Sequence, residues 1–148
     1  MDLDITIEDA TSGVIDRETR KMDVPSLGLG LTLSTPQVFR GRTLREWQTL
    51  AADPAAIPLP EREFRRTDHL LVRVAAASPG GPPTVTARLL NRDGGSMTPL
   101  TVSPAGAPGV VNIDTPLASL PTGEFLIEIS VTDGTEKTST LVAIRVTA

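Results

Sequence analysis

Apolar and polar residues alternate with a period of two near the end of the chain. From Phe125 to Val131 every second residue is apolar, and the alternation resumes from Val142 to Val146. This period is typical of a β-strand with one buried face. The polar, glycine-containing segment 133–137 lies between the two runs and has the composition of a turn. The pattern predicts a long hairpin whose apolar face must be covered by another layer of sheet.

Shorter runs of the same kind occupy the middle of the chain and are separated by clusters of glycine, proline and polar residues. The expected strands lie near residues 70–76, 85–89, 100–102 and 111–113. Turn signals at a spacing of about eight to twelve residues indicate an antiparallel β-sandwich of about seven strands. The predicted fold is all-β, an immunoglobulin-like or fibronectin-III-like sandwich over residues 31–148. Residues 31–40 contain Pro36 and fit an interrupted edge strand, and Leu117 and Leu120 are expected to anchor a crossing connection.

The first 25 residues predict a second hairpin, followed by a linker at 26–30. Ile5-Thr-Ile-Glu-Asp9 matches Ile129-Ser-Val-Thr-Asp133 in pattern. This hairpin is therefore either the remnant of a preceding domain or an extra pair of strands in the sandwich. An isolated hairpin is marginally stable in water. We expect it to pair with the main domain, to pair with another copy or to fray, and the first of these is favoured.

Residues 44–52 predict the one helix. Thr43 and Glu46 have the spacing of a capping box, and Asp53-Pro54 ends the run. Apolar residues fall at helical spacing at Leu44, Trp47, Leu50 and Ala51. Trp47 is interpreted as a buried plug at one end of the sandwich. If its ring were instead exposed, Trp47 with Arg42 and Arg45 would form a contact site for a partner protein.

Composition excludes several classes of function. The chain of 148 residues has no cysteine, so disulfides, thiol catalysis and thiolate metal sites are excluded. Its net charge is −4, and acidic residues lie among the arginines, which argues against a nucleic-acid footprint. Its four aromatic residues are few for a sugar-binding platform. The given sequence shows neither a signal peptide nor an apolar run long enough to span a membrane, so membrane insertion is not expected.

Neither catalysis nor a cofactor or metal site is predicted. His69 is the one histidine, and its neighbour Asp68 points to the opposite face if the strand has begun. Ser96 does not lie in a nucleophile-elbow motif. The segments 91–94 and 133–136 have the residues of ordinary turns and too few carboxylates for a calcium shell.

Several blocks of the sequence resemble known bacterial domains. The segment 120–133, with Phe125 at its aromatic position, is similar to the E–F corner of immunoglobulin-like and fibronectin-III-like domains. The blocks 33–40, 62–73 and 85–91, with Asp23-Val-Pro25 and the last hairpin, resemble the C-terminal region of bacterial von Willebrand factor A domain-containing proteins. The resemblance implies an accessory, extracytoplasmic β-sandwich. The Asp-x-Ser-x-Ser metal motif of the upstream domain in such proteins does not occur here.

These observations lead to one expected function and one alternative. We expect a non-catalytic accessory module of a larger exported bacterial protein, acting in domain spacing or protein–protein interaction. Its partners would be other domains of the same protein or another chain, including a homodimer formed through edge strands. The alternative is a carbohydrate- or peptide-binding module that uses the sandwich face or loop end. A groove lined by Trp47 or Phe64 would favour the alternative, and burial of both rings would count against it.

Overall fold

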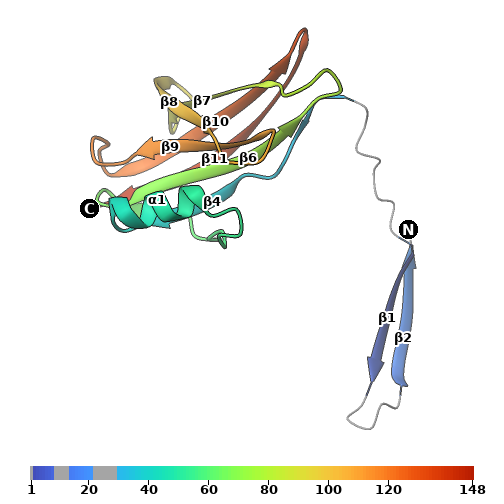
Figure 1. Ribbon diagram of the computed structural model, residues 1–148. Coiled ribbons are helices and arrows are strands. Elements are labelled where there is room, and N and C mark those ends of the chain that lie inside the picture. Colours follow the sequence, from blue (N-terminus) through green and yellow to red (C-terminus); the bar gives the residue numbers. More distant parts are fainter. Residues whose placement is uncertain (1, 9–13, 22–29) are drawn as a thin grey trace.

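The computed structural model describes residues 2–8, 14–21 and 30–148, which form β-strands and one short helix. The predicted all-β class with one helix is confirmed. The strands β1 (Asp2–Glu8) and β2 (Val14–Lys21) pair antiparallel in a two-stranded sheet of their own (Figure 1). Neither pairs with another described strand. The turn expected at 9–13 and most of the expected linker, residues 26–29, lie outside the described residues.

The remaining nine strands form one mixed sheet, in the order β3-β6-β9-β8-β7-β10-β11-β5, with β4 also paired to β6. Their bounds are β3 (Thr32–Leu33), β4 (Gln37–Gly41), β5 (Glu63–Arg65), β6 (His69–Ala77), β7 (Thr84–Asn91), β8 (Ser96–Pro104), β9 (Val110–Pro116), β10 (Gly123–Asp133) and β11 (Glu136–Thr147). The one helix is α1 (Leu44–Ala52). By strand pairing the sheet is continuous, so the immunoglobulin-like or fibronectin-III-like subclass stays a prediction.

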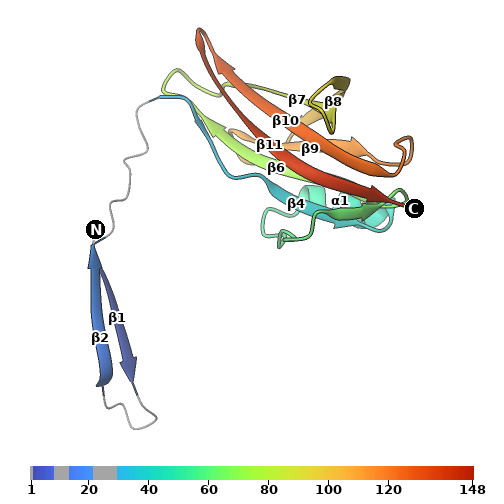
Figure 2. The same cartoon turned by 180° about the vertical axis from the view of Figure 1, so that it is seen from behind.

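The sheet curls because β8 changes partners along its length. Its first half pairs with β7 up to Leu100, and its second half pairs with β9 from Thr101 onwards. β10 and β11 pass in front of β6 and β9 in Figure 2. The apolar residues of these four strands share one buried cluster. Phe125, Ile127 and Val142 belong to this core, as the alternation predicts. Leu117 and Leu120 are also buried, which confirms them as anchors of the connection between β9 and β10.

The edge strand interrupted at Pro36 is confirmed. β3 and β4 lie on either side of this proline, and both pair antiparallel with β6. The structure also contains β5, a strand of three residues that the sequence reading placed in no strand. β5 runs parallel to the end of β11, with Phe64 opposite Val146.

α1 spans residues 44–52 as predicted, and its first turn is capped as expected. Thr43 Oγ1 accepts a hydrogen bond from the Glu46 amide at 3.2 Å. The Glu46 carboxylate accepts one from the Arg42 amide at 2.7 Å, one residue before the cap. At the other end, the last turn contains no basic residue. The last turn of α1 therefore has no cationic side chain of its own that could be the hydrogen-bond partner of the free carbonyls at the end of the helix.

Arg73 on β6 supplies that partner from outside the helix. Its guanidinium donates to the carbonyls of Leu50 at 2.7 Å and Asp53 at 2.9 Å, and to Oδ1 of Asn112 at 2.9 Å. Asn112 in turn donates to the carbonyl of Ala51 at 2.9 Å. Arg73 is only 6% exposed and lies on the face of β6 opposite the core. α1 is thereby held against the outside of the sheet.

This position corrects the interpretation of Trp47 as a plug at one end of the sandwich. α1 covers the outer face of β4 and β6 rather than an open end of the core (Figure 1). Trp47 is half-buried and is not a member of the core cluster. A Cβ at Gly41 would lie 2.7–2.9 Å from Trp47 atoms, so the helix approaches β4 closely at this glycine.

We predict that Arg73→Met destabilises the protein by about 2–4 kcal/mol, because several part-buried carbonyls and Asn112 lose their donor together. Urea unfolding would measure the loss, and amide exchange would show it concentrated in the last turn of α1. Arg88→Met is the matched control, because Arg88 is half-exposed and bonds one surface carboxylate, Glu128. Equal losses in the two variants would contradict the capping role.

Candidate functional site

β11 has no strand partner on one side along most of its length among the described strands, and we call this side the open edge. Its start lies near β3, where the Leu31 amide donates to the Glu136 carboxylate at 3.2 Å. β10 covers one side of β11, but on the other side β5 pairs only with Arg145, Val146 and Thr147. The Arg145 amide donates outward to the carbonyl of Arg62 at 2.8 Å. Because strand amides alternate in direction, the amides and carbonyls of the earlier odd-numbered residues also point outward. These are Lys137, Ser139, Leu141 and Ala143, all exposed and without a strand partner among the described residues.

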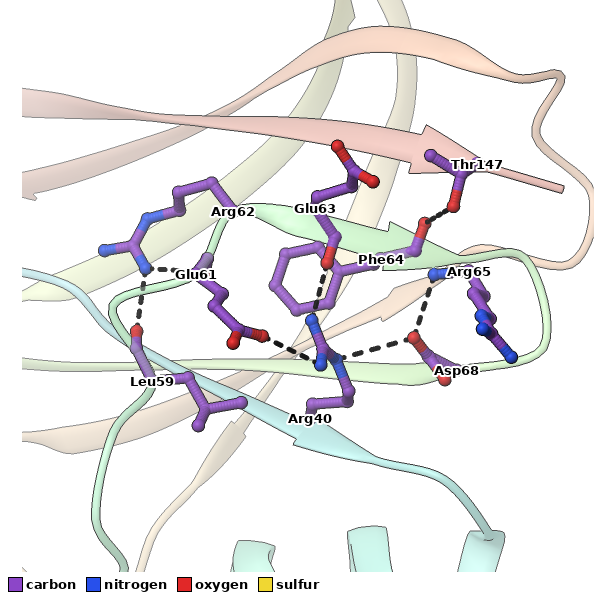
Figure 3. Close-up of polar contacts among 9 residues, drawn as sticks. All are labelled: Arg40, Leu59, Glu61, Arg62, Glu63, Phe64, Arg65, Asp68 and Thr147. Carbon is purple, nitrogen blue, oxygen red and sulfur yellow. Dashed lines mark hydrogen bonds and ion pairs between the residues drawn. The ribbon is translucent and has the colours of Figure 1, made fainter.

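The two ends of the curled sheet, β4 and β5, come together where the open edge ends, and we call this junction the seam. Arg40 joins β4 to β5 across the seam (Figure 3). The Arg40 guanidinium donates to the carbonyl of Glu63. It pairs with the carboxylates of Glu61 at 2.9 Å and Asp68 at 3.5 Å. It also lies over the ring of Phe64, 5.0 Å from the centroid. The longer contact from Nε to Asp68 is an ion pair without hydrogen-bond geometry.

A hollow of about 770 Å³ lies over this seam, and we call it the seam hollow. Its lining is rich in arginine and in oxygen-bearing side chains: Arg40, Arg42, Glu61, Arg62, Glu63, Phe64, Arg65, Thr67, Asp68 and Thr147. Arg62 is held by the carbonyls of Leu59 at 2.8 Å and Glu61 at 3.0 Å (Figure 3). The guanidinium groups of Arg42 and Arg65 have no hydrogen bond or ion pair to any described residue.

A second hollow of about 560 Å³ connects the seam with the open edge. It is lined by apolar residues of β10 and β11, including Leu126 and Ala143, and by charged residues around them. Two of these charges form long surface pairs, Arg92 with Glu124 at 3.7 Å and Arg145 with Glu63 at 3.9 Å. Arg62 and Glu63 line both hollows, so the open edge and the seam hollow form one continuous surface.

The three residues predicted to contact a partner differ in their relation to the two hollows. Arg42 lines the seam hollow. Arg45 lies exposed on α1, outside the linings of both hollows, and Trp47 is half-buried outside them too. Sequence reasoning missed Arg65 as a companion of Arg42. The clustering of arginines at 62–66 was a visible signal, but the interleaved acidic residues indicated a mixed solvated face.

His69 has a carboxylate neighbour that its local sequence does not reveal. Asp68 turns to Arg40 and to the Arg65 amide, whereas Asp114 on β9 lies close enough to His69 to interact electrostatically. Burial raises the pKa of Asp114, and the charge of His69 opposes that shift.

The site presents carboxylates that are already paired, and backbone and guanidinium groups that are not paired in the described part of the chain. The carboxylates of Glu61 and Asp68 are engaged by Arg40, so they face a fixed cation. Within the described ranges, no cluster of three or more histidine or acidic side chains could hold a metal ion. What the surface offers is outward backbone groups on β11, apolar side chains beside them and unpartnered guanidinium groups. These are the elements of peptide recognition.

Comparison of the sequence with profiles of known protein families and with curated proteins finds no match. Two solved structures resemble parts of the fold. One is the endo-beta-1,4-mannanase from Thermotoga petrophila, at 13% identity and a TM-score of 0.47, covering 61% of this chain and 18% of the mannanase chain. The other is a DUF4785 family protein from Legionella pneumophila, at 16% identity and a TM-score of 0.42, covering 60% of this chain and 26% of the other. The chain therefore corresponds to about a quarter or less of either protein's length.

Among the helices of the described residues, none has the length and apolar character needed to span a membrane.

We predict that Asp114→Asn raises the thermal midpoint of unfolding near neutral pH. The raised pKa of Asp114 means that the folded state favours the protonated carboxyl, so the wild-type chain loses stability as the pH rises through that pKa. The gain from the uncharged amide should therefore vanish in acid, below the ordinary value of 3.8. Thermal unfolding across the pH range measures it, and a gain that is constant with pH would contradict the ionisation argument.

Proposed function

We propose that this chain is a non-catalytic β module of a larger exported bacterial protein, and that it docks extended segments of neighbouring domains or other chains. The observation that carries the proposal is the open edge of β11. Residues 137–143 present outward amides and carbonyls over about 23 Å, at about 3.3 Å per residue. An extended peptide can add to such an edge as a further strand.

The outer face of β11 would give this strand addition a preference among peptide sequences. Leu141 is 56% exposed, and Ala143 lines the apolar second hollow. A strand added here would place alternate side chains beside these residues. Backbone pairing would supply much of the affinity, and the apolar hollow would select residues of suitable size.

The exported, accessory character of the proposal rests on the resemblance to the C-terminal regions of von Willebrand factor A domain-containing proteins. The aromatic residues argue for peptides over sugars as the ligand class. Phe64 is only 1% exposed, and Trp47 lines neither hollow. A sugar platform needs an accessible ring face, and neither ring supplies one in these hollows.

Strand addition can be tested with a labelled peptide of the sequence Asp2–Glu8. This sequence forms a strand in the protein itself and alternates apolar with polar residues. We expect the peptide to protect the amides of Lys137, Ser139, Leu141 and Ala143 from hydrogen exchange, because those groups would bond to its backbone. Ala143→Pro should weaken binding about tenfold or more, because proline removes an outward amide and blocks the edge sterically.

Two controls separate edge pairing from nonspecific adsorption. A peptide of the same sequence with alternate backbone amides methylated keeps its side chains but cannot pair, so it should not bind. Circular dichroism checks that Ala143→Pro keeps the wild-type fold, as expected for a position whose amide has no strand partner. Binding of the methylated peptide, or protection at sites other than the β11 edge, would overturn the proposal.

A further inference from the structure

We infer that the seam hollow is a carboxylate-binding site, and that it selects acidic protein segments through Arg42 and Arg65. This inference rests on the proposed function, because it names the class of partner that docks at the same surface. The hollow lies beside β5, which covers the last three residues of β11 directly after the open edge. A strand added along the open edge would therefore end beside Arg62, which lines both hollows.

In the seam hollow every carboxylate has a cationic neighbour, but two of the arginines have no acidic one within the described part of the chain. Its lining contains four arginines and three acidic residues. Two of the acidic residues, Glu61 and Asp68, pair with Arg40, and the third, Glu63, lies 3.9 Å from Arg145 outside the hollow. All three carboxylates thus have a cationic neighbour already. Arg42 and Arg65 remain without a charged partner among the described residues, in a chain whose net charge is −4.

The residues around Arg42 and Arg65 are held in place by several contacts, which supports a preformed carboxylate-binding site. Arg40 is held by the Glu63 carbonyl, two carboxylates and the Phe64 ring, so it cannot turn to a ligand without breaking these contacts. The Asp68 carboxylate also accepts a hydrogen bond from the Arg65 amide at 2.8 Å (Figure 3). This bond fixes the backbone from which the Arg65 side chain extends. The backbone of Arg42 is fixed by Glu46 at the start of α1. Two guanidinium groups therefore extend from well-anchored backbone positions.

Guanidinium groups match carboxylates in geometry as well as in charge. Each can donate two parallel hydrogen bonds to one carboxylate, which an ammonium group cannot do. The lining contains arginine as its only basic residue type. Side chains of aspartate and glutamate at one end of a docked segment supply the complementary groups. Because the site is open to solvent, binding should weaken as the salt concentration rises.

The test uses the full chain and a fluorescein-labelled hexaglutamate peptide, with binding followed by fluorescence anisotropy. We expect the wild-type protein to bind hexaglutamate in low salt. The double variant Arg42→Gln/Arg65→Gln should bind at least about fivefold more weakly, since each exposed charge contact contributes modestly. The matched control is Arg45→Gln/Arg88→Gln, which removes the same charge from positions that line neither hollow and should bind within about twofold of wild type.

Three outcomes would overturn the inference. They are absence of hexaglutamate binding to the wild-type protein, equal loss of binding in the two double variants, and equal binding of hexalysine. Ala143→Pro separates this result from the proposed function, because it blocks the edge and leaves the seam hollow intact. If the edge peptide binds the wild-type protein and hexaglutamate does not, the carboxylate site fails while strand addition stands. If hexaglutamate binds and the edge peptide does not, strand addition fails.

Discussion

The burial of the apolar faces of β10 and β11 is the constraint on which the rest of the structure depends. These two strands form the longest ladder of the sheet, and their inner residues have no cover within the hairpin itself. The continuous sheet supplies the cover by curling, with β8 passing from β7 on one side to β9 on the other. A sheet that covers its own face in this way keeps two edges, and they meet at β4 and β5. Arg40 joins these edges at one end, while residues 137–143 of β11 have no strand partner on this side among the described residues.

A second set of apolar residues is buried on the outer face of β4 and β6, and Arg73 holds α1 against this face. Leu71 and Phe39 are buried outside the core cluster, on the two strands that α1 contacts. The carbonyls at the end of α1 then lie near the sheet, where water reaches them poorly. Arg73 donates to these carbonyls, and its guanidinium lies 4.9 Å from the centroid of the Phe39 ring. It also donates to Asn112, which in turn bonds the carbonyl of Ala51. One buried arginine therefore attaches the helix and completes its end.

Local patterns in the sequence were sufficient for the elements that local interactions stabilise. The period-two runs located β10 and β11, and Thr43 with Glu46 located the start of α1, because alternation and capping depend on residues close in sequence. β5 was missed because it has three residues and pairs with β11 about eighty residues away, as with Phe64 and Val146. Arg73 was missed as a buried group because an arginine at an outward strand position usually faces water. The helical spacing of Trp47 with Leu44, Leu50 and Ala51 placed it on the apolar face of α1. That spacing could not show which part of the sheet this face would cover.

The candidate site depends on the same long-range contacts, which explains why only one of its main residues was predicted. Arg42 was chosen for its nearness to Trp47, yet it belongs with Arg65, which lies 23 residues further along the chain and reaches the hollow from β5. What brings the two together is the meeting of β4 and β5, and that meeting follows from the curl of the sheet. A surface of this kind can vary without loss of the fold, because its outward amides and unpartnered arginines make no contact with the core. Its charges can therefore be adapted to a partner while Arg40 and Arg73 hold the sheet and helix in place.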